Sequence, residues 1–139
     1  MITLNIDLTD DIDAVFYLKV LVTLAKGDDG RIDAQELAFI RAQADLLSAD
    51  VSPYLNDGQH SIDFTKHIDP PSRETALAIV RDGIALGYIN GDFRAEQKSV
   101  LYTVALSLGL ATDDVDAVEE WLKEFWVVLK KGNDLLHAQ

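Results

Sequence analysis

Apolar residues recur along most of the chain at the three- and four-residue spacing typical of α-helices, and glycine, proline or capping residues separate the runs. The first run predicts a helix over about residues 10–26. Thr9 and the aspartates after it favour a helix start, because a hydroxyl can cap the chain and carboxylates complement the positive end of the helix dipole. The apolar positions of this helix are too numerous for one narrow stripe, which predicts burial on several sides.

A second helix is predicted from Asp33 to Leu47. Asp33 and Glu36 form the pattern of a capping box, in which the Asp33 side chain accepts a hydrogen bond from the Glu36 N–H while Glu36 reaches back. Residues 48–69 are the least regular stretch and are predicted to form a connector. Pro70-Pro71 then predicts the first turn of another long helix, since a proline lacks the N–H that would be unpaired there.

Two further helices are predicted in the last third of the chain, over about residues 93–108 and residues 112–131. The final helix carries one stripe of large apolar residues at helical spacing, which is typical of a core or a helix–helix interface. This stripe consists of Val115, Val118, Leu122, Phe125 and Leu129. Trp121 flanks it and is expected to be largely buried, and Gly132 is expected to end the helix.

The chain also contains an internal repeat, because a shift of 61 residues places residues 30–36 over residues 91–97. The match continues through core positions of the same size, namely Ile40 over Leu101, Ala44 over Ala105 and Leu47 over Leu108. The expected fold is therefore all-α: a single domain forming a pseudo-symmetric helical bundle of two helix-turn-helix units plus a C-terminal helix. The units are expected over about residues 10–47 and 70–110.

Charge and composition narrow the range of partners. Twenty-four acidic and 12 basic residues give a net charge of -12, a field that repels nucleic acids and anionic membranes and favours divalent cations or a basic protein surface. No apolar run approaches the roughly 20 residues that would span a bilayer, so no membrane insertion is expected. The first residues do not have the pattern of a signal peptide, which predicts a cytoplasmic protein.

Catalysis is not expected. The chain contains no cysteine, and no serine-histidine-aspartate arrangement is evident, so the sequence offers no candidate nucleophile. His60, Asp63 and His67 would share a face if residues 60–67 were helical, and two histidines with a carboxylate can bind zinc. The alternative is that these histidines are simply solvated. An enzymatic function would require such a zinc centre.

The segment LAKGDDGRIDAQE, residues 24–36, resembles the TerB-like tellurite-resistance family, as do the second glycine turn at residues 90–91 and the closing LSLGL of residues 106–110. The resemblance implies an all-helical fold, a role in stress response or tellurite resistance, divalent-metal binding through acidic residues, and no established catalysis. The family pattern falls on Asp29 and Glu36. In the second unit Asn90 and Gln97 stand at these places, which leaves a second acidic site in doubt.

The carboxylates around the first glycine turn form the candidate metal site. Asp28, Asp29, Asp33 and Glu36 could gather oxygen ligands around one Ca²⁺ or Mg²⁺ ion. The register is not that of an EF-hand, because Ala25 would occupy the first ligand position. Capping and turn formation explain the same residues without any metal.

Two functional hypotheses remain open. The first is a non-enzymatic TerB-like domain with a stress-related role and a divalent-cation site at the first Asp-Gly turn. The alternative is an acidic helical partner-binding protein, of the immunity or inhibitor type, that covers a basic protein surface.

Overall fold

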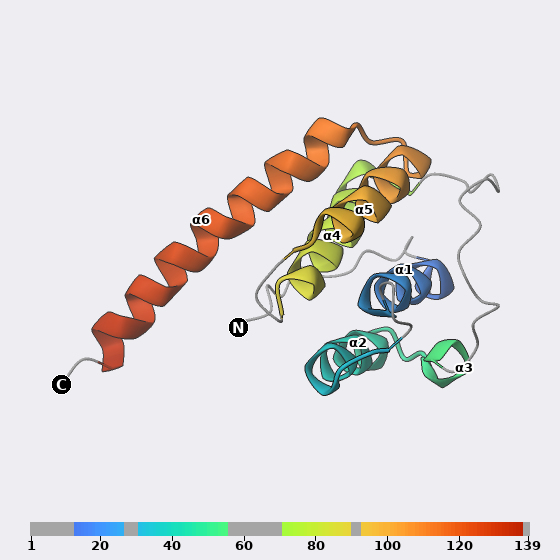
Figure 1. Ribbon diagram of the computed structural model, residues 1–139, viewed down its shortest axis with the longest axis horizontal. Coiled ribbons are helices and arrows are strands. Elements are labelled where there is room, and N and C mark those ends of the chain that lie inside the picture. The colour runs from blue at the N-terminus through green and yellow to red at the C-terminus, as the bar shows by residue number, and fades with distance from the viewer. Residues whose placement is uncertain (1–12, 27–30, 56–70, 90–92, 138–139) are drawn as a thin grey trace.

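The computed structural model describes residues 13–26, 31–55, 71–89 and 93–137 (Figure 1). Within these ranges the chain forms helices and no strand, so the predicted all-α fold is confirmed. The helices are α1 (Ala14–Lys26), α2 (Ala34–Leu46), α3 (Ser52–Leu55), α4 (Arg73–Gly87), α5 (Ala95–Ser107) and α6 (Thr112–His137).

α1 and α4 pack against each other at the centre of the molecule. α1 also contacts α2 and α3, whereas α4 also contacts α5 and α6 (Figure 1). Both central helices are buried on most of their sides, as the density of apolar residues in the first helix predicted. α4 and α5 approach closely, because a Cβ atom at Gly83 would lie 2.7 Å from the Leu101 Cδ2 atom. A larger residue at this position would therefore force the Leu101 and Leu24 side chains to shift.

Two helix starts differ from the prediction. α1 begins at Ala14, because the Asp13 Oδ1 atom accepts a hydrogen bond from the Phe16 N–H at 3.1 Å. Thr9, the expected cap, lies outside the described residues. α4 begins after the prolines, because the Ser72 hydroxyl accepts from the Thr75 N–H at 3.2 Å. In both cases the residue whose side chain reaches the backbone N–H three positions later sets the start.

The end of α6 was also predicted wrongly, since this helix continues through Gly132 to His137. A glycine ends a helix mainly by adopting the left-handed conformation. Gly109 does so, with φ of 82°, and among the described glycines it alone has positive φ. Gly132 therefore remains an ordinary helical residue. No helix in the described ranges is long and apolar enough to cross a membrane.

The two helix pairs end in the same way. Ser48 and Gly109, which the repeat aligns, both have positive φ, 51° and 82°. The next residue then bonds back to the helix: the Ala49 N–H donates to the Ala44 carbonyl at 2.9 Å, and the Leu110 N–H donates to the Ala105 carbonyl at 2.8 Å. The repeat found in the sequence thus extends through the helix ends, where these bonds satisfy carbonyls that the helix leaves unpaired.

Trp121 is not buried, contrary to the prediction. Its exposed fraction is 44%, whereas Val115 and Leu122 are fully buried against the bundle. Adjacent residues of a helix point about 100° apart, so the burial of Leu122 turns Trp121 toward solvent. Trp126 instead packs at the edge of the core, with its ring 5.4 Å from that of Tyr88 in an edge-to-face arrangement.

A polar cluster lies inside the apolar core. The Tyr17 hydroxyl donates to the Asp82 Oδ2 atom at 2.6 Å, and the Arg81 Nε atom donates to the Asp82 Oδ1 atom at 2.9 Å. The Gln43 side-chain oxygen lies 3.3 Å from the same hydroxyl, which brings α1, α2 and α4 together. Burial and the neighbouring Asp82 raise the pKa of Tyr17. These bonds specify how the three helices meet, because an unpaired polar group here would be costly.

Candidate functional site

Two of the four predicted metal ligands are described, and they lie together at the start of α2. Asp33 caps the helix, with its Oδ1 atom accepting from the Glu36 N–H at 2.8 Å, as the capping-box pattern predicted. The Glu36 side chain is only 8% exposed. Asp28 and Asp29 lie outside the described residues, as do His60, Asp63 and His67 of the possible zinc cluster.

The carboxyl group of Glu36 has an unusual environment. Burial, followed by the neighbouring Asp33 carboxylate, raises the pKa of Glu36 to about 7, while the Asp33 N–H and Arg94 act in the opposite direction. Near neutral pH a proton therefore competes with any cation for this carboxyl group. Within the described residues, no three histidine, aspartate or glutamate side chains converge closely enough to hold a metal ion.

Gln97 occupies the equivalent place in the second helix pair, and its side-chain amide both accepts and donates a hydrogen bond. The side-chain oxygen accepts from the Arg94 N–H at 3.1 Å, and the Nε2 atom donates to the Leu24 carbonyl at 3.2 Å. This second bond ties α5 to the end of α1. An ionised glutamate could not make it, because a carboxylate only accepts hydrogen bonds.

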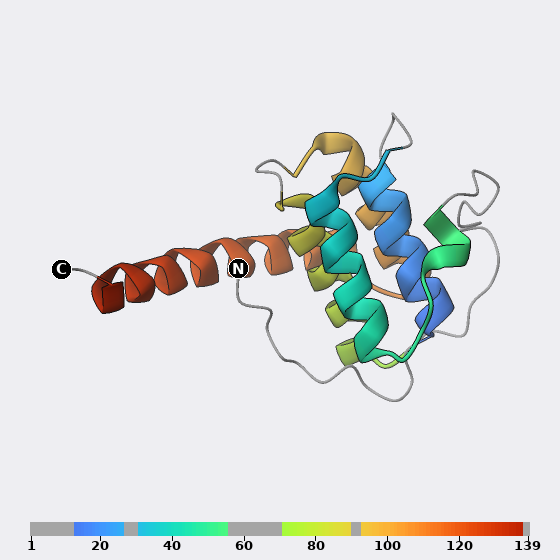
Figure 2. The ribbon, with the colours of Figure 1, turned by 90° about the horizontal axis from the view of Figure 1, so that it is seen from below.

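A different candidate site lies on α6. The first half of this helix packs on the bundle, whereas its second half extends beyond the other helices (Figures 1 and 2). We call residues 121–137 the α6 arm. Five of its large apolar side chains are strongly exposed: Trp121 (44%), Val127 (69%), Val128 (69%), Leu135 (72%) and Leu136 (81%).

Three of these exposed residues, together with two half-buried residues between them, form one row, which we call the outer stripe. It consists of Trp121, Phe125, Val128, Gly132 and Leu135. The spacing alternates between four and three residues, which keeps the row on one face over four turns. Within it, the rings of Trp121 and Phe125 lie 6.1 Å apart. The outer stripe lies beside the stripe of Val115 and Leu122 that packs in the core, so α6 has two apolar faces.

A groove opens where α6 leaves the bundle. It has a volume of about 350 Å³ and is lined by Tyr88, Trp126, Leu129, Lys130 and Asn133. The walls are mainly aromatic and aliphatic, and polar groups stand along α6. A groove of this composition can accept an apolar side chain with a polar tip.

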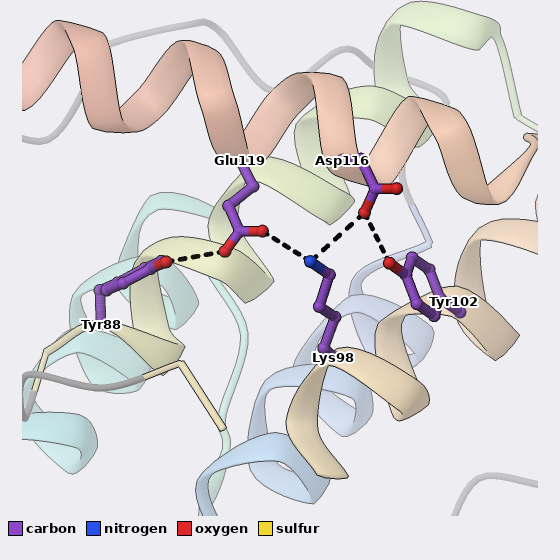
Figure 3. A network of polar contacts seen from close by, with 5 residues as sticks. All are labelled: Tyr88, Lys98, Tyr102, Asp116 and Glu119. Carbon is purple, nitrogen blue, oxygen red and sulfur yellow. Dashed lines mark hydrogen bonds and ion pairs between the residues drawn. The ribbon is translucent and has the colours of Figure 1, made fainter. Parts of the chain in front are cut away.

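A network of charged and polar groups fixes the direction in which α6 leaves (Figure 3). Lys98 of α5 donates to Glu119 of α6 at 2.9 Å and lies 3.4 Å from Asp116. Tyr88 donates to Glu119 at 2.7 Å, and Tyr102 donates to Asp116 at 2.5 Å. Burial opposes the charge on Glu119, but the bonds from Tyr88 and Lys98 outweigh it and lower the pKa of Glu119. The network therefore stays charged at neutral pH and holds α6 to both α4 and α5.

Comparisons of the chain with protein-family models, with curated proteins and with solved structures give no match. The TerB-like resemblance therefore stays a prediction. Two described regions of the molecule are candidates for a function, namely the buried carboxyl group at the start of α2 and the apolar surface of the α6 arm.

The outer stripe was missed in the sequence, although its signal was present. Phe125 was predicted to lie in the core stripe, but it is only half-buried and forms, with Trp121, Val128 and Leu135, a second row of the same spacing. A helix with two apolar faces either is buried on both or keeps one for a partner, and periodicity alone does not separate these cases. The polar cluster around Asp82 left no signal at all, because Tyr17 and Asp82 lie 65 residues apart in the sequence.

Proposed function

We propose that this chain works by binding another protein through the α6 arm, without catalysing a reaction. The observation that carries the proposal is the outer stripe, an apolar row that extends beyond the bundle. Apolar residues scattered singly over a surface are ordinary, but a contiguous row along a projecting helix is typical of an interaction site. The contact is thus apolar in character, which modifies the hypothesis that charge alone recruits a basic partner.

The spacing of the outer stripe favours a helical partner. Residues that alternate at four and three positions fit the holes between side chains on another helix. The groove beside Trp126 adds a second anchoring point, and its tyrosine and tryptophan are residue types that often dominate binding energy. Trp126, Leu129 and Asn133 each point about 100° away from the neighbouring residue of the outer stripe, so the groove is a separate anchoring point on another face of α6.

The test compares two adjacent valines. Val127 and Val128 are equally exposed, at 69%, but Val128 belongs to the outer stripe and Val127 points about 100° away from it. Proteins captured from the native host by the parent should be lost with Val128→Asp and retained with Val127→Asp. Circular dichroism should show the same helix content in all three proteins. Equal capture by both variants would contradict the proposal.

A cation-dependent TerB-like role in stress or tellurite resistance is the second proposal, supported by the buried carboxyl group of Glu36 beside Asp33. If Ca²⁺ or Mg²⁺ binds at the first glycine turn, the cation should stabilise the parent by about 2.7 kcal/mol at 100 times its dissociation constant. Glu36→Gln and Asp29→Asn should lose most of this gain. Thermal melts in chelator and in cation, at constant ionic strength, would measure it. An equal response in the parent and Glu36→Gln would exclude the site.

A further inference from the structure

We infer that the partner of the outer stripe is the α6 arm of a second copy of this chain, lying antiparallel to the first. This inference rests on the proposed function and names the partner. A symmetric pair of this kind requires a surface that is complementary to itself. The residues of the α6 arm meet this requirement in their sizes and in their charges.

The sizes match about a centre at Val128. Trp121 and Leu135 each lie seven residues from Val128, so in an antiparallel pair Trp121 faces the Leu135 of the other copy. Phe125 then lies near Gly132 of the other copy, and a large ring meets a residue without a side chain. The space around Gly132 is open, since a Cβ atom there would have nothing from its own chain within 4 Å. Large residues thus fit against small or medium ones along the whole outer stripe.

The charges also favour a second copy. The whole chain carries a net charge of -12, yet the α6 arm contains three lysines against one glutamate and one aspartate. The arm therefore lacks the acidic excess that makes two copies repel each other. Away from the bundle, the remaining long-range repulsion is screened by salt.

The orientation is set by Glu124 and Lys131, which lie on the same flank of the outer stripe, two helical turns apart. Neither forms an ion pair with the other described residues of its own chain. In an antiparallel pair centred at Val128, each Glu124 faces the Lys131 of the other copy. In a parallel pair, the flank that carries Glu124 and Lys131 would face the opposite flank of the other copy, so Glu124 would not meet Lys131.

The pair should be weak. The outer stripe covers about 20 Å of helix, at 1.5 Å per residue, and so short a contact buries less surface than a permanent dimer requires. Dimerisation should therefore depend on protein concentration in the micromolar range. It should also strengthen with salt, whereas binding to a basic protein partner would weaken.

The absence of cysteine from the chain allows a direct test. Val128 lies on the symmetry axis of the pair, so Val128→Cys should form a disulfide-linked dimer under mild oxidation. Val127→Cys has the same exposure and should remain monomeric. Equal cross-linking of both variants, or of neither, would overturn the inference.

Sedimentation equilibrium on the intact chain provides the second measurement. The parent should shift from monomer to dimer as its concentration rises, and Val128→Asp should not. Glu124→Lys should weaken the dimer roughly three- to tenfold, because it places a lysine opposite Lys131 of the other copy. Adding Lys131→Glu to this variant should restore the parent affinity. A parallel pair would leave Glu124→Lys unchanged and would overturn the assigned orientation.

The outcomes separate this inference from the proposed function. A parent that stays monomeric at all concentrations overturns the second copy as partner. Capture of a different protein that still depends on Val128 would then leave the proposed function standing. A parent that stays monomeric and captures no protein through Val128 would contradict both proposals.

Discussion

The two helix pairs, α1–α2 and α4–α5, have the same plan, but their second helices differ at the buried third position. Glu36 and Gln97 are both the third residue of their helix, and both are buried. The amide of Gln97 accepts and donates at once, so its burial is fully compensated. The carboxyl group of Glu36 can donate only while it keeps its proton, and burial raises its pKa to about 7. The amide nitrogen of Gln97 makes a structural contact, whereas the carboxyl oxygen at the same place in Glu36 belongs to a group that titrates near neutral pH.

The helix pairs differ again in the length of the helix that comes after each of them. Both pairs end in a left-handed residue, and a new helix begins a few residues later. After the first pair, α3 has four residues, whereas after the second pair α6 has 26. Among the described residues, only the second unit therefore extends beyond the common core, and the apolar surface of the α6 arm is the result. The internal repeat accounts for the two helix pairs of the bundle, and the long α6 that follows the second pair carries the proposed binding surface.

The largest expected effect tests whether the two pairs share one core. Ile40 and Leu101 occupy equivalent positions and are fully buried. Ile40→Ala and Leu101→Ala should each reduce the free energy of unfolding by about 2–5 kcal/mol, because each leaves a cavity. Both should shift one common transition in urea, followed by circular dichroism. Two separate transitions, each sensitive to one variant, would show that the pairs fold independently.

A smaller effect is expected when Glu36 is replaced by glutamine, the residue that the second pair has at the equivalent position. The pKa of Glu36 is 4.5 in an ordinary environment and about 7 in the fold. The folded state thus holds this proton more tightly, and its contribution to stability is complete below about pH 4.5 and is lost as the pH rises through 7. At 1.36 kcal/mol per pKa unit, the loss is about 3 kcal/mol.

Glu36→Gln should remove this dependence on pH and should make the protein more stable than the parent by about 2–3 kcal/mol at pH 8. At pH 4 the two proteins should be nearly equal. Urea titrations at a series of pH values would measure the difference. The reciprocal change, Gln97→Glu, should introduce a similar dependence in the second pair. A parent and Glu36→Gln that respond alike to pH would show that this carboxyl group is solvated.

The sequence predicted the parts of the fold that depend on local pattern. Asp33 caps α2 as expected, and the core positions Ile40 and Leu101 are buried. The predicted start of α1 was wrong, because Thr9 and the aspartates after it can all cap a helix, and the sequence pattern does not choose among them. The exposure of Trp121 was missed because the packing of α6 on α4 and α5 decides which of its faces is buried, and that packing is tertiary.

The candidate sites divide in the same way. Proximity of Asp33 and Glu36 results from their spacing in one helical turn, so the sequence could predict it. The raised pKa of Glu36 could not be predicted, because it comes from burial beneath other elements. The outer stripe could be recognised as a helical face, but its exposure depends on α6 continuing past the bundle through Gly132.

The smallest expected effect concerns the residues that end the two pairs, Ser48 and Gly109. Both adopt the left-handed conformation, which costs a residue with a side chain roughly 1–2 kcal/mol and costs glycine almost nothing. Ser48→Gly should therefore stabilise the protein by about 0.5–1 kcal/mol, since the greater freedom of glycine in the unfolded chain offsets part of the gain. Gly109→Ser should destabilise it by about 1 kcal/mol.

Gly109→Ser tests the backbone conformation alone, because a Cβ atom at Gly109 would have nothing within 4 Å and no steric clash contributes. Combining both changes exchanges the two residues between the pairs and should leave the stability close to that of the parent. Urea midpoints at unchanged denaturant slope would measure these differences. A destabilised Ser48→Gly would show that the Ser48 side chain contributes at its helix end and that the two ends, alike in backbone, are held by different interactions.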